Sequence, residues 1–81
     1  MKMTNMTLYY KPTCPYCIKV LDFMEEEGVE LEMKDTYVTE NLEELKALNN
    51  GITQVPCLDV NGHPMLESAD IISFLRNIVH S

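Results

Sequence analysis

Cys14 and Cys17 stand three residues apart where a strand gives way to a helix, and this arrangement restricts the folds open to the chain. Met6–Tyr10, just before them, has the β-branched and aromatic character of a strand. Pro15 favours a helix start, because proline is preferred at the first helical position. Apolar residues then follow at helical spacing as far as a stop at Gly28: Cys17, Val20, Leu21 and Met24. The sequence therefore predicts a helix that begins at the two cysteines.

Three more strands and two more helices are predicted beyond this first helix. They are a strand at Val29–Lys34, a helix capped by Thr39 and ended by Asn50-Gly51, strands at Val55–Val60 and His63–Leu66 joined by a turn at Asn61-Gly62, and a helix capped by Ser68. The order is β-α-β-α-β-β-α. The first β-α-β unit predicts parallel strands, and the hairpin adds an antiparallel edge. We expect one α/β domain over residues 1–81, with a four-stranded mixed sheet whose two faces are covered by the three helices.

Composition narrows the possible functions. The 81 residues are 46% hydrophobic and 23% charged, a balance typical of a small globular domain. A net charge of −7 argues against a nucleic-acid partner, which needs a basic face. No apolar run approaches the roughly 18–20 residues of a membrane span, and residues 1–7 lack the apolar core of a signal peptide. Three cysteines are an odd number for a secreted disulfide scaffold, so we expect a cytoplasmic protein.

The spacing of Cys14 and Cys17 predicts redox chemistry. On the first helical turn both sulfurs lie on one face, near enough to form a disulfide. Cys14 at the helix N-terminus is favoured as a thiolate by free N–H groups and by the helix dipole, so we expect Cys14 to attack and Cys17 to resolve. Two alternatives stay open: a zinc site completed by Cys57 and His63, and an inert structural disulfide. Cys57 itself is predicted to be a buried apolar thiol.

The whole chain resembles a glutaredoxin, since its segment KPTCPYC matches the family pattern K-x-x-C-P-Y-C. The resemblance implies a thioredoxin-like fold and a cis proline in Val55-Pro56 that faces the cysteines. It also implies a glutathione site in which Val55 pairs its backbone with the cysteinyl part, Lys11 holds the glycyl carboxylate and Tyr16 lines the groove. Gln54, where threonine is usual, belongs to the same candidate site.

The C-terminal half departs from glutaredoxins and is similar to another family. Leu66-Glu67-Ser68-Ala69-Asp70 replaces the glutaredoxin segment G-G-x-D-D. The stretch VPCLDVNGHPMLESADIISFL instead resembles the N-terminal domain of glutathione transferases, with their V-P-x-L and E-S-x-x-I patterns. That resemblance implies that Glu67 and Ser68 bind the γ-glutamyl end of glutathione, with helix N–H groups around its carboxylate.

These patterns together predict a glutathione-dependent thiol–disulfide oxidoreductase. Its substrates would be protein disulfides and glutathionylated proteins, with glutathione as co-substrate, no bound cofactor or metal, and electrons supplied from NADPH through a reductase. We expect it to act as a monomer. Two alternatives remain: a hydrogen donor fed by thioredoxin reductase without glutathione, and a module that binds glutathione or an iron–sulfur cluster without turnover.

Overall fold

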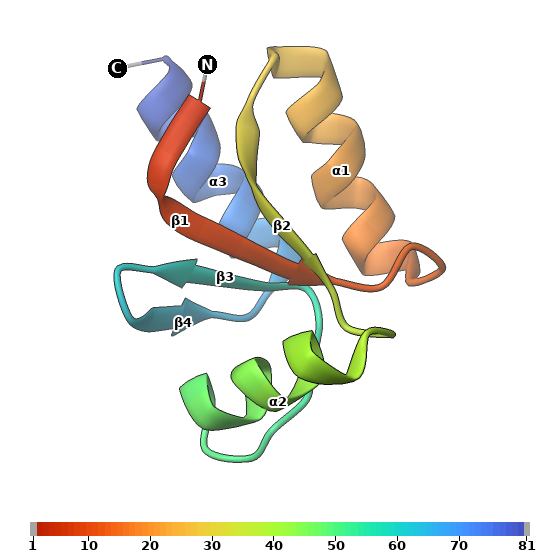
Figure 1. The fold of residues 1–81 in the computed structure, drawn as a ribbon. Coiled ribbons are helices and arrows are strands. Elements are labelled where there is room, and N and C mark those ends of the chain that lie inside the picture. The colour runs from red at the N-terminus through yellow and green to blue at the C-terminus, as the bar shows by residue number, and fades with distance from the viewer. Residues whose placement is uncertain (1, 81) are drawn as a thin grey trace.

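A computed structural model describes residues 2–80 and orders them as predicted, β-α-β-α-β-β-α (Figure 1). The elements are β1 (Lys2–Tyr10), α1 (Pro15–Glu27), β2 (Glu30–Asp35), α2 (Thr39–Leu48), β3 (Cys57–Val60), β4 (His63–Met65) and α3 (Ser68–Val79). Within this range no helix is long and apolar enough to cross a membrane.

The four strands form one mixed sheet in the order β2-β1-β3-β4. β1 pairs with β2 in parallel and with β3 antiparallel, and β3 pairs with β4 antiparallel. Asn61 and Gly62 join β3 to β4 with φ angles of 53° and 91°. Two successive positive φ angles are what a tight two-residue hairpin requires, and Asn-Gly meets that requirement. The predicted sheet and hairpin are therefore confirmed.

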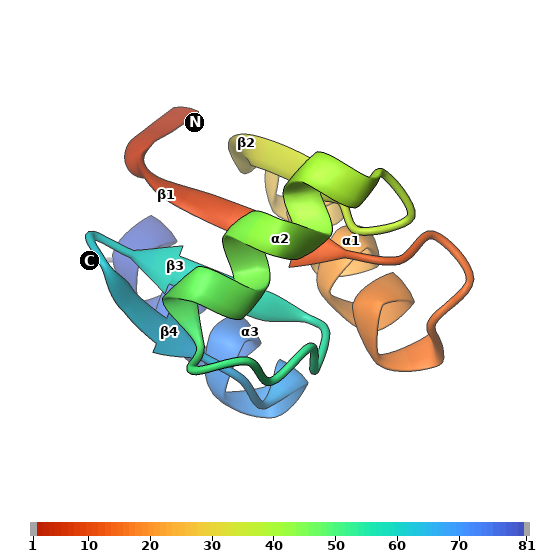
Figure 2. The ribbon, with the colours of Figure 1, turned by 60° about the horizontal axis from the view of Figure 1, so that its bottom comes forward.

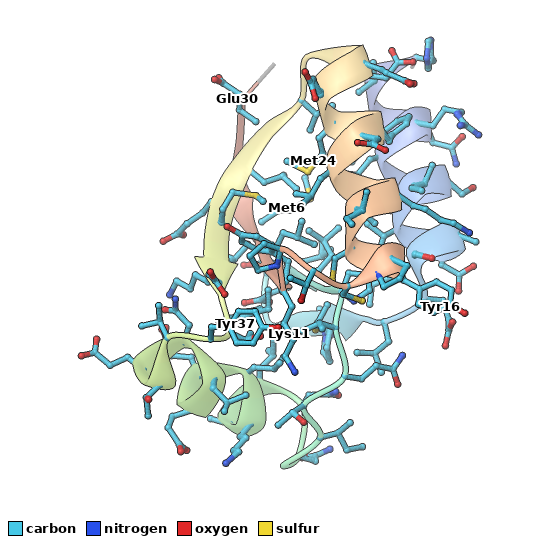
Figure 3. The ribbon with its side chains drawn as sticks, turned by 90° about the vertical axis from the view of Figure 1, so that its right-hand side faces the viewer. Met6, Lys11, Tyr16, Met24, Glu30 and Tyr37 are labelled. Atoms are coloured by element: carbon cyan, nitrogen blue, oxygen red, sulfur yellow. The ribbon has the colours of Figure 1, made fainter. Side chains whose placement is uncertain are left out.

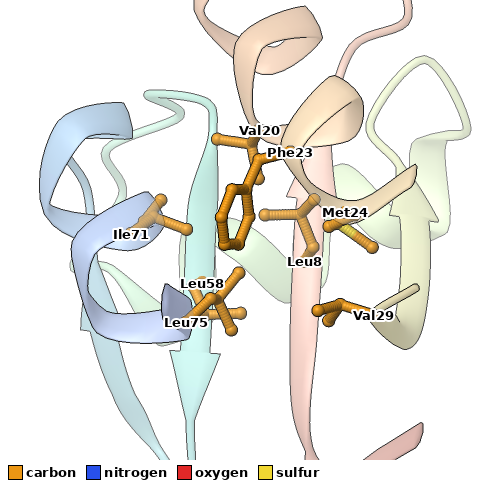
Figure 4. Packing of buried hydrophobic residues seen from close by; sticks show 8 residues of the cluster. All are labelled: Leu8, Val20, Phe23, Met24, Val29, Leu58, Ile71 and Leu75. Carbon is orange, nitrogen blue, oxygen red and sulfur yellow. The ribbon is translucent and has the colours of Figure 1, made fainter. Parts of the chain in front are cut away.

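The helices cover both faces of the sheet: α1 and α3 lie on one face and α2 on the other (Figures 1 and 2). Side chains of β1 and β3 alternate between the two faces, as strand geometry dictates. The pair Leu8 and Leu58 enters the core under α1 and α3, while the adjacent pair Tyr9 and Cys57 packs with Leu45 of α2. The larger core holds eight buried residues (Figure 4): Leu8, Val20, Phe23, Met24, Val29, Leu58, Ile71 and Leu75.

Several predicted boundaries need correction. Thr39 and Ser68 are the first residues of their helices, while Val38 and Glu67 take the N-cap positions without a side-chain capping bond. Leu48 ends α2, before the predicted Asn50-Gly51 stop. The predicted stop at Gly28 is confirmed, since it closes α1 with a φ of 67° that suits glycine.

The strands also differ from prediction at their ends. β1 begins at Lys2 instead of Met6, because its N-terminal part pairs with β2 near Glu30. β3 begins at Cys57, two residues after the predicted Val55, and β4 ends at Met65, one residue before the predicted Leu66. Pro56 has no N–H to donate to a strand ladder, which explains the later start of β3.

Candidate functional site

Cys14 occupies the N-cap position of α1, at the junction between β1 and the helix. Its φ and ψ of −79° and 123° are extended, so the helix starts with Pro15, as predicted. The Cys14 N–H donates to the Lys11 carbonyl at 3.1 Å, which closes the turn after β1. The Cys14 carbonyl accepts the first helical hydrogen bond, from the Ile18 N–H at 2.9 Å. The sulfur therefore sits beside the unpaired N–H groups of the first turn.

The two cysteines of the pair differ in environment. Partial burial of Cys14 acts to raise its pKa, but hydrogen bonds from the Cys17 N–H, the Cys17 thiol and the Tyr16 N–H, together with the Lys11 charge, outweigh that effect and lower the pKa. Burial dominates at Cys17, which is fully enclosed, and raises its pKa to about 11. The Lys11 N–H donates to Cys17 Sγ at 3.5 Å. The pair thus contains one thiol that ionises readily and one that stays protonated.

A cleft of about 420 Å³ is lined by Tyr16, which stands between the two cysteines in sequence, while Cys14 and Cys17 themselves are not part of its lining. Its lining contains six residues that sequence patterns assigned to a glutathione site, with Leu66 in addition: Tyr16, Gln54, Val55, Pro56, Glu67 and Ser68. They come from three distant segments, the start of α1, the loop before β3 and the start of α3. The Val55–Pro56 peptide bond is cis, as the resemblance implied, and Pro56 is fully buried. The fold therefore gathers these six residues in one place.

Lys11 lies outside the lining of this cleft and contacts Tyr37 instead. Its ammonium nitrogen is 5.7 Å from the centre of the Tyr37 ring. The Tyr37 hydroxyl is 2.7 Å from Oγ1 of Thr13, one residue before Cys14. In Figure 3, Lys11 and Tyr37 lie side by side, and Tyr16 lies across the same face at the start of α1. Lys11, Thr13 and Tyr37 form a group that we call the Lys11 corner.

Tyr37 is a site residue that the sequence patterns did not identify. It follows β2, the parallel neighbour of β1, and the carboxyl ends of parallel strands meet at one edge of a sheet. That rule could have placed the residues after β2 near Cys14. Like Tyr16, Tyr37 is largely exposed: 62% of this large aromatic residue is open to solvent.

The residues proposed for a zinc site do not come together. Cys57 is fully buried beside Tyr9 and Leu45, and burial raises the pKa of its thiol to about 11. His63 is exposed on β4. Across residues 2–80, no group of three or more His, Cys, Asp or Glu side chains could hold a metal ion. Cys57 is therefore the buried apolar thiol that the sequence predicted.

Comparison with protein families gives one match over almost the whole chain. The family model described as "Glutathione S-transferase, N-terminal domain" matches residues 8–80. No curated protein sequence matches the chain significantly.

Solved structures of similar fold include two transferases and one thioredoxin-like protein. The Leishmania protein TDR1, a trimeric glutathione transferase, is 30% identical with a TM-score of 0.73, over 90% of this chain and 16% of that one. Glutathione transferase Omega 3C from Trametes versicolor is 26% identical with a TM-score of 0.73, over 91% of this chain and 33% of that one. The thioredoxin-like protein BC3987 is 22% identical with a TM-score of 0.75, over 94% of this chain and 99% of that one.

These likenesses confirm the predicted thioredoxin-like fold. They also agree with the resemblance drawn from Glu67, Ser68 and the segment before them. This chain spans a third or less of the length of the two transferases. Glutaredoxin activity stays a prediction that rests on the Cys14–Cys17 pair.

Proposed function

Because this chain belongs to the family of glutathione S-transferase N-terminal domains, we propose that it acts on glutathione, and specifically as a glutathione-dependent thiol–disulfide oxidoreductase. The observation that carries this function is the contrast within the cysteine pair. Cys14 is partly exposed and its pKa is lowered, whereas Cys17 is enclosed and its pKa is raised to about 11. A thiolate nucleophile with a protonated partner one helical turn away is what thiol–disulfide exchange requires.

The chemistry of the residues that line the cleft at Tyr16 suits glutathione. The backbone of Val55, next to Pro56, would pair with the cysteinyl part and bring its sulfur to Cys14. The γ-glutamyl end carries both an ammonium and a carboxylate. Glu67 matches the ammonium, while Ser68 and the N–H groups of the first turn of α3 match the carboxylate.

The remaining contacts would fix the other end of the peptide. Tyr16 and Gln54 would line the groove, since both border the cleft. Lys11 would hold the glycyl carboxylate by reaching across from the Lys11 corner.

The reaction would proceed by two thiol–disulfide exchanges. The Cys14 thiolate attacks the glutathione sulfur of a mixed disulfide, so that a new S–S bond forms while the protein thiolate leaves and takes up a proton. A second glutathione thiolate then attacks the glutathione held on Cys14, which releases oxidised glutathione and restores the Cys14 thiolate. The NADPH-dependent reduction of oxidised glutathione closes the cycle.

Protein disulfides would follow a second route. Cys14 forms the mixed disulfide, Cys17 loses its proton and attacks Cys14 Sγ, and the substrate leaves as a dithiol. Two glutathione molecules then reduce the Cys14–Cys17 disulfide. We place this activity in a reducing compartment such as the cytoplasm, in a monomer that needs no bound cofactor.

A coupled NADPH assay tests the function. Oxidation of NADPH should require both glutathione and glutathione reductase, with a glutathionylated peptide as substrate. Cys14→Ser should abolish turnover of every substrate, while Cys17→Ser should keep deglutathionylation and lose protein-disulfide reduction. Turnover with thioredoxin reductase alone would instead favour the glutathione-independent donor. Visible absorbance after aerobic purification would favour the cluster-binding module.

A further inference from the structure

Hydrogen bonds connect the segments that follow β1 and β2, at the carboxyl ends of these parallel strands. Thr36, which follows β2, donates to the Tyr10 carbonyl at the end of β1 from both its N–H (2.9 Å) and its hydroxyl (3.2 Å). Its side chain is almost fully buried, so this connection is well enclosed. The residue after Thr36 is Tyr37, which is thereby held over the loop that leads to the nucleophile.

The polar contacts of Tyr37 either fix its place or reach that loop. The Tyr37 N–H donates to the Asp35 carboxylate at 2.9 Å, which sets the direction of the chain after β2. The hydroxyl pairs with Thr13, and the ring lies beneath the Lys11 ammonium. Because 62% of Tyr37 is exposed, core packing does not explain why an aromatic residue stands here.

Lys11 connects this contact to both thiols. Its carbonyl accepts from the Cys14 N–H at 3.1 Å, and its N–H donates to Cys17 Sγ at 3.5 Å. Its backbone is therefore fixed by the cysteine pair, whereas the long side chain is free to rotate unless something holds it. The Tyr37 ring is the contact that holds it.

We propose that Tyr37 is a positioning residue of the thiol site, which holds the Lys11 ammonium and Thr13 in place so that Lys11 is ready to bind the carboxylate of an incoming thiol. This inference rests on the proposed function. It assigns no contact between Tyr37 and the substrate. A lysine already ordered before binding loses less conformational freedom when the ligand arrives, and affinity rises accordingly.

A double-mutant cycle between Tyr37 and Lys11 tests the proposal. Tyr37→Leu should raise the KM for a glutathionylated peptide about two- to fivefold, the range expected for loss of an exposed cation–π contact, with kcat near the wild-type value. In the Lys11→Ala background, Tyr37→Leu should change KM no further, because the side chain it holds is gone. Val38→Ala, which trims the exposed neighbour of Tyr37, is the matched control and should keep wild-type KM.

The outcomes separate this inference from simpler roles. An unchanged KM in Tyr37→Leu, with only a lower melting temperature, would overturn the proposal in favour of a structural role. An equal rise of KM in both backgrounds would overturn it in favour of direct substrate contact. If Tyr37→Leu does not fold, Tyr37→Gln decides, since it removes the ring and places a polar side chain at this exposed position; a raised KM supports the proposal and a wild-type KM overturns it.

A readout without glutathione keeps the two hypotheses apart. The pH midpoint of Cys14 alkylation should move upward in Tyr37→Leu, by less than about one unit, because Lys11 favours the thiolate. Lys11→Ala should remove this dependence on Tyr37. If wild-type protein turns over no glutathione substrate, the proposed function fails and this midpoint alone decides: a shift supports the role of Tyr37, and no shift overturns it.

Discussion

Cys14 and Cys17 are the same residue type one helical turn apart, and only their surroundings distinguish them. Partial burial disfavours ionisation of the Cys14 thiol, but its sulfur accepts hydrogen bonds from two backbone N–H groups and one thiol. The net effect lowers its pKa. The Cys17 sulfur accepts a single long hydrogen bond from the Lys11 N–H inside the fold, so burial prevails. In the proposed thiol exchange, Cys14 is therefore the attacking sulfur and Cys17 the resolving one.

Alkylation kinetics test the ionisation of Cys14. In the Cys17→Ser protein, the rate of reaction with iodoacetamide should reach its plateau with a midpoint below the 8.5 of a free cysteine, because hydrogen bonds to the Cys14 sulfur lower its pKa. Serine retains a hydroxyl that can donate to the Cys14 sulfur, so the hydrogen-bond pattern is largely kept. The same protein in urea is the control and should give a midpoint near 8.5. A folded-state midpoint at that value would remove Cys14 as the nucleophile.

Site residues were predictable where neighbouring positions in the sequence carry the pattern, and they were missed where the contact joins distant positions. Cys14, Pro15 and Cys17 are adjacent in sequence, so helix-start preferences alone predict their arrangement. Tyr37 meets Thr13 across 24 residues of sequence, and that contact exists only because β2 pairs in parallel with β1. No periodicity in residues 35–38 marks it.

At the scale of elements, α3 brings a candidate ligand group to the cleft without using it as a helix cap. Ser68 is the first residue of α3, Glu67 takes the N-cap position, and no side-chain hydrogen bond caps this helix. Ser68 also lines the cleft. The stability of α3 and the proposed binding role of Ser68 can therefore be tested separately.

Ser68→Ala tests that separation. The substitution should leave the free energy of unfolding within about 0.5 kcal/mol of wild type, because it removes no capping bond. The KM for a glutathionylated peptide should rise several-fold, because a hydrogen bond to the γ-glutamyl carboxylate is lost. Denaturant unfolding and steady-state kinetics on the same preparation check both parts. A loss of about 1 kcal/mol with unchanged KM would show that Ser68 serves the helix and not the ligand.

Element types were easier to predict than element ends. Asn61-Gly62 and Gly28 predicted a hairpin and a helix stop correctly, since only certain residues tolerate positive φ. Helix starts shifted by one residue, because Thr39 and Ser68 suit either the cap or the first turn. The N-terminal part of β1 was missed, since its pairing near Glu30 depends on a partner strand and leaves little local pattern.

At the scale of the whole molecule, the alternation of β1 and β3 builds one core on each face of the sheet. The order of elements predicted this architecture, and the sequence also predicted a buried Cys57; in the structure both Cys17 and Cys57 are fully enclosed. Burial raises the pKa of each thiol to about 11. At alkaline pH these two thiols keep their protons in the folded state and lose them in the unfolded state, so the stability of the whole domain depends on pH.

This linkage predicts that stability falls at alkaline pH. Below about 8.5 folded and unfolded chains both keep these protons, so Cys17 and Cys57 add no pH dependence. Between about 8.5 and 11 the unfolded chain releases protons that the folded chain retains, so the free energy of unfolding decreases as pH rises. At pH 9.5 the expected loss is about 1 kcal/mol for each thiol.

Denaturant unfolding of the reduced Cys14→Ser protein at neutral pH and at pH 9.5 measures this loss. Cys14 is removed because its pKa is lowered in the folded state, so its effect on stability is opposite to that of the buried thiols. It increases the free energy of unfolding as pH rises through its folded-state pKa toward 8.5, and this gain would mask part of the loss. Adding Cys57→Val deletes one of the two buried thiols and should roughly halve the difference between the two pH values. An undiminished difference in that variant would mean that Cys57 ionises alike in both states, and that its burial beneath α2 does not hold the proton in place.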